Sequence, residues 1–227
     1  MNYELDYEKF AEMVEADVKA GLIPFYYSGS WGNTFSAAID INLRVVELCK
    51  KYGMWVHVDA AFLGSTWICE KYRPKEPVLN VIDSICINFT KLLLNGTGGS
   101  LFYVGNKRMV NESFGANALH FSFYKNEYTN ECDVVDYKDW IVGLARRNNA
   151  IKLYYTFLHY GLKRIRESVL SNEEKALRLV EKIRAQADLF NIHTIQYSVV
   201  LFQVKDKHGQ ASNHLTKSVA LKIKNIK

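Results

Sequence analysis

Apolar residues recur along this chain with the spacing of helices in some segments and of strands in others. Helical spacing marks residues 6–20 and 41–52, where one side of each segment is apolar. A glycine follows each segment, at Gly21 and Gly53, and glycine commonly ends helices. The pattern therefore predicts two amphipathic helices early in the chain.

Short, nearly continuous apolar runs lie between and after these helices. They cover residues 23–30, 55–60, 85–90 and 101–104, and runs of this length predict buried strands. Strands that alternate with helical segments pair in parallel, whereas the short link before residues 101–104 favours a hairpin. We therefore expect a layered α/β fold with a mostly parallel sheet, flanked by helices, and one antiparallel strand.

The pattern changes after the fourth predicted strand. Residues 106–133 are polar and irregular, and a loop of that length is often functional. Two long helices are expected over 137–160 and 171–187, the second opened by the capping-box pattern Ser171-Asn172-Glu173-Glu174. A late strand is expected at 198–204, and the lysine-rich segment after it predicts a solvated helix face.

Composition and charge exclude several classes of protein. Hydrophobic residues make up 48% of the chain and charged residues 23%, which is typical of a globular protein. The net charge of +5 is modest and the basic residues are dispersed, so we expect no nucleic-acid partner. No apolar run approaches the roughly 20 residues that span a bilayer, so we expect no membrane contact.

The cysteines and the first residues point to a reduced, cytoplasmic location. The chain begins with an acidic segment that lacks the apolar core of a signal peptide. The cysteines contain no CxxC pair, so neither a disulfide framework nor a metal site is expected. They are Cys49, Cys69, Cys86 and Cys132. Cys86 lies inside an apolar run, which predicts a small buried hydrophobic residue.

The strongest chemical signal is the pair Asp59 and Lys91, each at the end of a predicted strand. In open α/β sheets the carboxyl ends of the strands form the ligand crevice. An amine there can condense with an aldehyde cofactor, while a carboxylate holds a ring nitrogen protonated. These are the two groups that a protein supplies to pyridoxal phosphate. Alone, Asp59 is equally consistent with a capping carboxylate, and Lys91 alone is more typical of a solvated surface lysine.

Two other features have simpler structural interpretations. His57 alternates with valines, which favours a packed core histidine over an acid–base residue. The segment Asn95–Gly99 is rich in glycine, but no Lys-Ser or Lys-Thr follows it as in a phosphate-binding P-loop. No G-x-G-x-x-G follows a predicted strand either, which disfavours a dinucleotide-binding fold.

Several segments, taken in order, resemble the group II pyridoxal-phosphate decarboxylases, which include the aromatic-L-amino-acid, tyrosine and histidine decarboxylases. Three blocks carry the resemblance, and Asp59 and Lys91 within them are 32 residues apart, as in that family. The blocks are Gly21-Leu22-Ile23-Pro24-Phe25, His57-Val58-Asp59-Ala60-Ala61 and Asn88-Phe89-Thr90-Lys91. Later strings agree as well, at Asp136–Trp140 and Gly143–Arg147.

The resemblance implies a role for each matching position. Lys91 would bind pyridoxal 5'-phosphate through an imine and Asp59 would pair with the pyridine nitrogen. Ala61 would lie under the cofactor ring, Asn88 near the phosphate, and Ser30 beside the cofactor as a small hydroxyl residue. No metal is implied.

The resemblance also implies a fold and an activity. The fold would be part of a fold-type I large domain over residues 1–165, followed by the beginning of a small α/β domain over 166–227. The activity would be a carboxy-lyase that converts an aromatic or imidazole amino acid to its amine. The alternative is a catalytically degenerate paralogue or fragment that acts as a non-enzymatic interaction partner. Either protein would form a homodimer, or a heterodimer with a full-length relative.

The sequence also departs from the family pattern. Family members are about twice as long. They usually carry proline and histidine before the reactive lysine, where this chain has Phe89 and Thr90. The catalytic-loop tyrosine of the family falls in an ambiguous stretch, where His120, Phe121 or Tyr124 occupies its place.

Overall fold

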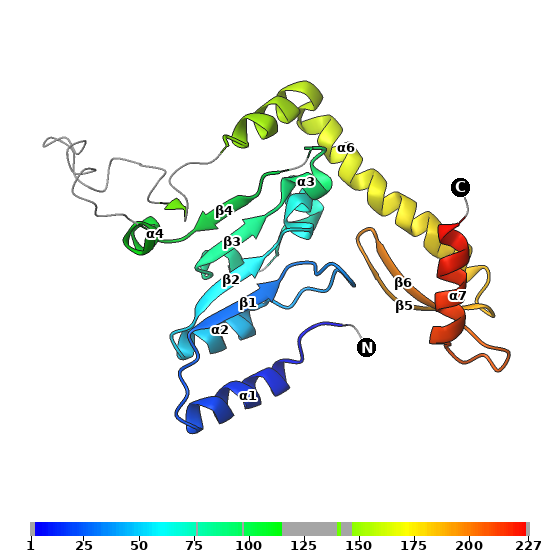
Figure 1. The fold of residues 1–227 in the computed structure, drawn as a ribbon, viewed down its shortest axis with the longest axis horizontal. Helices are drawn as coiled ribbons and strands as arrows, with labels where there is room; N and C mark the ends of the chain where they lie inside the picture. The colour runs from blue at the N-terminus through cyan, green and yellow to red at the C-terminus, as the bar shows by residue number, and fades with distance from the viewer. Residues whose placement is uncertain (1–2, 76, 97, 115–139, 142–146, 226–227) are drawn as a thin grey trace, which may run out of the picture.

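The structure is a computed structural model that describes residues 3–75, 77–96, 98–114, 140–141 and 147–225. It consists of a four-stranded sheet with helices on one face, a long bent helix, and a C-terminal hairpin with its own helix (Figure 1).

The strands of the sheet lie in the order β1-β2-β3-β4, so each strand is next to the one that follows it in the sequence. Its strands are β1 (Tyr26–Ser30), β2 (Trp55–Asp59), β3 (Ser84–Ile87) and β4 (Leu101–Val104). The first three strands are parallel, and β4 is antiparallel to β3. The mostly parallel α/β sheet and its one antiparallel strand are therefore confirmed.

Two amphipathic helices lie in the first part of the chain, as the sequence predicts. Helix α1 (Tyr7–Lys19) begins at Asp6, whose side chain accepts a hydrogen bond from the backbone of Lys9. Helix α2 (Leu43–Lys51) begins at Asn42, which caps it in the same way. Since their apolar sides pack into the same core as the strands, these helices cover one face of the sheet.

The main core lies between α2 and the middle of the sheet. Val56 and Val58 of β2 are completely buried and pack with Val45, Val46 and Cys49 of α2. Alternate residues of β2 point to the other face, where Trp55 and His57 are half-buried and Asp59 is exposed. The sheet therefore has one buried face and one partly open face. Asp59 is the last residue of β2 and lies on the open face.

Short helical turns connect β2 with β3 and follow β3. The first three are 3-10 helices: η1 (Leu63–Ile68), η2 (Glu70–Tyr72) and η3 (Pro77–Asn80). The fourth is the α-helix α3 (Phe89–Leu92), which directly follows β3. Lys91 therefore lies in a helical turn beyond the strand, not at the end of a strand as the apolar run predicts.

The segment after β4 is partly helical. Helix α4 (Lys107–Phe114) occupies the start of the segment 106–133, so the expected irregular loop is wrong for those residues. The helix has only about two turns, and such a short amphipathic pattern is hard to recognise in a polar segment. Residues 115–133 lie outside the described part of the chain.

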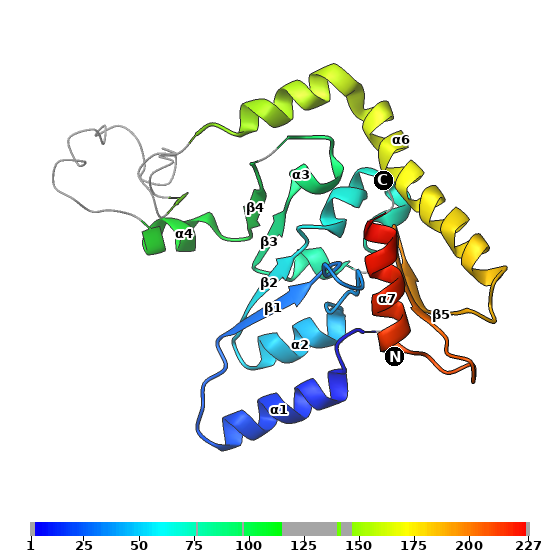
Figure 2. The same cartoon turned by 45° about the vertical axis from the view of Figure 1, so that its right-hand side comes forward.

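Helix α6 (Ala150–Arg184) consists of two helical arms that meet at Gly161, and the sequence predicts the end of the first long helix at residue 160. Gly161 has non-helical angles, with φ of 70° and ψ of 160°, and it bends the helix into two arms (Figures 1 and 2). The predicted end at residue 160 is therefore confirmed, whereas the second arm begins directly after Gly161 and not at the predicted Ser171. The acidic residues of that capping pattern form ion pairs instead, Glu173 with Lys71 and Glu174 with Arg178.

The C-terminal part is a hairpin covered by a helix. Strands β5 (Phe190–Gln196) and β6 (Val199–Val204) are antiparallel, and helix α7 (Asn213–Lys224) packs on β6. The sequence predicts only the second strand, because β5 has no continuous apolar run and its alternation is broken at His193-Thr194, where the pairing shifts register. The expected helix after it is confirmed, with exposed lysines at 217, 222 and 224.

The second arm of α6 is anchored to the helical turns on either side of β3, α3 after it and η1 before it. Ile165 is completely buried and packs against Phe89 and Leu93 beside α3. The Arg166 Nε donates to the carbonyl of Ile68 at 2.8 Å. Because α6 runs through residue 165, the proposed domain boundary lies within a helix, and it stays a prediction.

We expect Ile165→Ala to lower the free energy of unfolding by about 3 kcal/mol, because it leaves a cavity between α6 and α3. Leu162→Ala is the matched control, since Leu162 is on the same helix but 49% exposed, and it should change stability by less than about 1 kcal/mol. Chemical denaturation of both variants measures the difference. Equal effects would mean that α6 is not anchored through Ile165.

Candidate functional site

Three side chains lie side by side where the parallel strands end. The register pairs Asp59 of β2 with Ser30 of β1 on one side and with Cys86 of β3 on the other. The ladder continues one residue further, because the Ala60 N–H donates to the Cys86 carbonyl at 3.0 Å. Since the three strands run in parallel, their carboxyl ends meet at one edge of the sheet, which is where open α/β sheets bind ligands.

The carboxylate of Asp59 is exposed and is held by one of its two oxygens. Its Oδ1 accepts a hydrogen bond from the backbone N–H of Ala61 at 3.0 Å. The Sγ of Cys86 lies 3.6 Å from the same oxygen. Both of these contacts are made by Oδ1, and neither involves Oδ2. The carboxylate is therefore oriented and still accessible.

Lys91 lies at the same edge, on the turn that follows β3. Its side chain is exposed, and its Nζ lies 6.0 Å from the centroid of the Phe62 ring. Phe62 comes three residues after Asp59, so the amine and the carboxylate face the same short segment. Both charges also act on one thiol, because Asp59 raises the pKa of Cys86 and Lys91 lowers it, while burial gives the net increase. Asp59 and Lys91 therefore both act on the Cys86 thiol at the carboxyl edge of the sheet, and their pairing as a cofactor site stays a prediction.

Asn88 holds the turn that carries Lys91. Its Oδ1 accepts from the backbone N–H of Thr90 at 2.9 Å and from the Thr90 hydroxyl at 2.5 Å. Its carbonyl accepts from the Ser65 hydroxyl at 3.1 Å. Asn88 is therefore the N-cap of α3, and its expected position near a cofactor phosphate stays a prediction.

We expect Asn88→Ala to reduce stability by about 1 kcal/mol, the usual loss when a helix cap is removed. Asn88→Asp keeps an accepting oxygen and should retain most of that stability. Thermal unfolding without added ligand measures both variants. A loss that appears only with cofactor present would instead assign Asn88 to the cofactor.

Ser30 has a partner outside the sheet edge. Its hydroxyl hydrogen-bonds to the carboxylate of Asp40, an interaction that opposes the effect of burial, which raises the pKa of Asp40. Asp40 also accepts from the Leu5 N–H at 3.0 Å. The cofactor contact expected of Ser30 therefore stays a prediction, as does the place of Ala61 under a ring.

The two departures from the family pattern have local structural roles. Phe89 is buried and packs beside Leu93 and Ile165. A side chain at Gly99 would come within 2.5 Å of the Phe89 ring, so the glycine makes room for it. Thr90 completes the Asn88 cap. These residues fix the turn under Lys91 through packing and hydrogen bonding.

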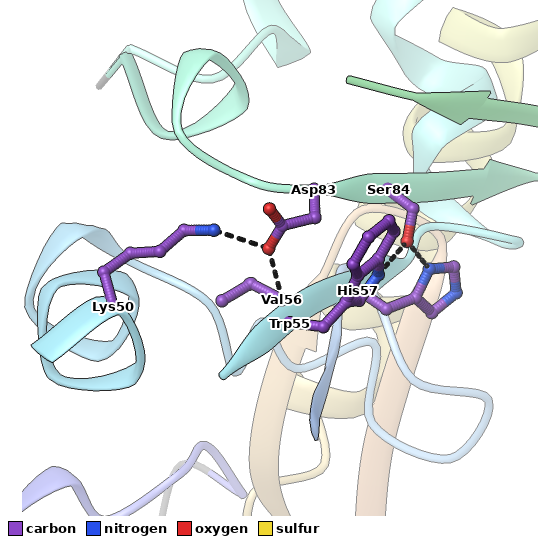
Figure 3. A network of polar contacts seen from close by, with 6 residues as sticks. All are labelled: Lys50, Trp55, Val56, His57, Asp83 and Ser84. Atoms are coloured by element: carbon purple, nitrogen blue, oxygen red, sulfur yellow. Dashed lines mark hydrogen bonds and ion pairs between the residues drawn. The ribbon is translucent and has the colours of Figure 1, made fainter. Parts of the chain in front are cut away.

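His57 lies on the open face, two residues before Asp59. Its Nδ1 is 2.8 Å from the Ser84 Oγ, which also accepts from Trp55 Nε1 at 2.8 Å (Figure 3). Burial lowers the pKa of His57, and the nearby Asp59 charge only partly opposes this. The ring also contacts Tyr26 and Phe102, at centroid distances of 6.4 and 6.1 Å. His57 is thus a packed, hydrogen-bonded residue.

A second group in Figure 3 supports the opposite end of these strands. The Asp83 Oδ2 accepts from the Val56 N–H at 2.6 Å and from Lys50 Nζ at 2.5 Å. Asp83 precedes β3, whereas Asp59 ends β2. Asp83 is therefore a structural carboxylate at the amino end of the sheet.

Sequence reasoning missed two neighbours of the site, Phe62 and Cys86. We predicted Cys86 to be a small buried hydrophobic residue, but it is partly exposed and contacts Asp59. The signal that points to this role is its spacing of two from Ser84, which places both on the same face of β3. Only the register between β2 and β3 shows which residue each one faces.

Some expectations concern residues outside the described part of the chain. His120, Phe121 and Tyr124 are outside, so the residue in the place of the loop tyrosine is not assigned. In the part of the chain that the structure describes, no group of histidine, cysteine and acidic residues is arranged to hold a metal. None of the described helices combines the length and apolar character needed to cross a membrane.

Comparison with known proteins decides the family. Residues 2–205 match the pyridoxal-dependent decarboxylase conserved domain. The chain belongs to this family. The resemblance that the sequence motifs indicate is therefore confirmed, and so is the α/β fold class. Pyridoxal phosphate, the expected cofactor, is the cofactor of this family.

Plant decarboxylases and aldehyde synthases are among the relatives of this chain. The chain is 33% identical to phenylacetaldehyde synthase of Arabidopsis thaliana over 93% of this chain and 43% of that protein. It is 30% identical to tyrosine decarboxylase 2 of the same plant, over 92% of this chain and 38% of the relative. The chain therefore spans about two fifths of the length of these relatives.

Solved structures share the fold over nearly the whole chain. Tryptophan decarboxylase of Oryza sativa, with pyridoxal phosphate and tryptamine, superimposes with a TM-score of 0.86 and 26% identity. The match covers 98% of this chain and 46% of that one. The 4-hydroxyphenylacetaldehyde synthase of Rhodiola rosea gives a TM-score of 0.84 at the same identity, over 98% of this chain and 44% of that one.

Proposed function

We propose that this chain binds pyridoxal 5'-phosphate through Lys91 and Asp59 and acts as a carboxy-lyase on an aromatic or imidazole amino acid. One observation carries the proposal. An accessible carboxylate and an accessible amine lie at one carboxyl edge of a parallel sheet, with Cys86 as their common neighbour. The family of the chain is the second support.

The residues present fit the cofactor's reactive groups. Lys91 is exposed, so its amine can attach covalently to an aldehyde. Asp59 keeps a carboxylate oxygen accessible for a protonated ring nitrogen, and the Ala61 N–H fixes the orientation of that carboxylate. When bound, pyridoxal phosphate supplies the electron sink that stabilises the negative charge left by departing carbon dioxide.

The relatives suggest which substrates and products to test. Those named tyrosine and tryptophan decarboxylases support a small aromatic amino acid as substrate. Those named phenylacetaldehyde and 4-hydroxyphenylacetaldehyde synthases make an aldehyde the second candidate product beside the amine.

The decisive experiment uses the purified 227-residue chain. Addition of pyridoxal phosphate should produce the visible absorbance band of a lysine-bound cofactor. Release of carbon dioxide is then measured with tyrosine, tryptophan, phenylalanine and histidine, and amine and aldehyde products are separated. A band without carbon dioxide release favours the non-enzymatic paralogue. A chain that folds and gives no band overturns the proposal.

The proposal includes assembly and location. We infer a homodimer, or a heterodimer with a full-length relative, because the first arm of α6 exposes Ile151, Tyr154 and Leu158 along one side. Sedimentation of the chain alone, and mixed with a relative, measures this assembly. A monomer under both conditions contradicts it.

The dispersed free thiols support a cytoplasmic location.

A further inference from the structure

Two polar contacts join β2 to β3 on the open face of the sheet, one above the other. The register pairs His57 with Ser84 and Asp59 with Cys86. In the first pair, the Ser84 Oγ lies 2.8 Å from the His57 Nδ1. In the second, the Cys86 Sγ lies 3.6 Å from the Asp59 Oδ1. Each polar side chain of β2 therefore faces a small hydrogen-bonding side chain of β3.

The second of these contacts acts on the carboxylate at the candidate site. The Cys86 thiol of β3 and the Ala61 N–H just after β2 both reach Oδ1 of Asp59. Two donors on one oxygen restrict rotation of the carboxyl group more than a single donor can. Oδ2 is then the oxygen presented to a ligand at the edge of the sheet.

The thiol remains a donor at neutral pH. Burial, together with the charge of Asp59 and its hydrogen bond, raises the pKa of Cys86 above the usual range of cysteine. A protonated thiol is a weak donor, and a carboxylate is the strongest kind of acceptor it can meet.

We propose that Cys86 is a positioning residue that orients the Asp59 carboxylate toward the ring nitrogen of the bound cofactor. The inference rests on the proposed function and deepens it, because it assigns to β3 a part in holding the cofactor. Cys86 acts through Asp59 and is not itself a catalytic residue.

The first test concerns the contact alone and needs no cofactor. Asp59→Asn removes the negative charge beside the thiol, so the pKa of Cys86 should fall and its thiolate fraction should rise. Alkylation of Cys86 by iodoacetamide at pH 8, followed by peptide mass spectrometry, should become about threefold faster or more. Cys69 is the internal reference, since it lies away from Asp59 against the carbonyl of Arg166. An unchanged rate at Cys86 would overturn the contact.

The second test concerns positioning and uses the affinity for pyridoxal phosphate. Cys86→Ala should raise the dissociation constant about fivefold, as expected for one hydrogen bond, whereas Cys86→Ser keeps a donor and should restore affinity. Cys69→Ala is the control and should leave the dissociation constant unchanged. In the Asp59→Ala background, which has no side-chain oxygen to accept from the thiol, Cys86→Ala should have no further effect on it. Equal weakening in both backgrounds would mean a merely structural role.

The two tests separate this inference from the proposed function. If the wild-type chain gives no cofactor band, the proposed function fails, and the alkylation rates still decide whether Cys86 and Asp59 interact. If the band forms and the variants behave additively, the proposed function stands and the positioning role of Cys86 is wrong.

Discussion

Replacing Lys91 with alanine is expected to abolish the visible absorbance of the cofactor-loaded protein and to leave the fold intact. The band requires an amine that attaches covalently to the cofactor, and Lys91 is the exposed lysine at the edge where Asp59 lies. Stability should change by less than about 0.5 kcal/mol, because the side chain is exposed and the Asn88 cap is retained. Absorbance spectra and thermal unfolding measure the two effects.

Two further variants separate charge from chemistry. Lys91→Arg keeps the positive charge, but a guanidinium stays protonated and does not condense with an aldehyde, so the band should again be absent. Lys163→Ala removes an exposed lysine on α6 instead, and the band should persist. A normal band in Lys91→Ala would assign the covalent attachment to another lysine.

The sheet was predictable because it depends on local patterns. Continuous apolar runs defined the strands, and the polar residues that follow such runs had to lie at their carboxyl ends. This placed Asp59 at the end of β2 and Lys91 shortly after the end of β3. The helical turn under Lys91 was not predicted, because it depends on one side-chain cap, from Asn88 to Thr90, within a run that is otherwise typical of a strand.

Other features depend on contacts between distant residues and were therefore missed. Nothing local shows that the capping pattern at Ser171 lies within α6, since Ile165 and Glu173 hold that arm against residues from another part of the chain. The contact between Cys86 and Asp59 likewise needs the register of two strands. A sequence pattern gives the face of a residue, whereas its partner across the sheet comes only from the structure.

Asp59→Asn should reduce turnover by about a hundredfold or more while it leaves the fold unchanged. The amide has nearly the shape of the carboxylate but lacks the negative charge that keeps a pyridine nitrogen protonated, so the electrostatic stabilisation at that nitrogen is lost. Since Asp59 is exposed, stability should change by less than about 1 kcal/mol. Steady-state rates and denaturation measure the two effects, and cofactor affinity replaces the rate if the chain has no turnover.

Asp83→Asn is the matched control, because Asp83 is a carboxylate of the same sheet with a different function. It accepts from the Val56 N–H and from Lys50 at the amino end of the strands. Its replacement should cost about 2 kcal/mol of stability and leave the turnover of the folded fraction unchanged. Asp59→Asn should show the reverse. If the two variants lost stability and activity in the same proportion, Asp59 would be a structural residue like Asp83, and the proposed site would lose its acidic partner.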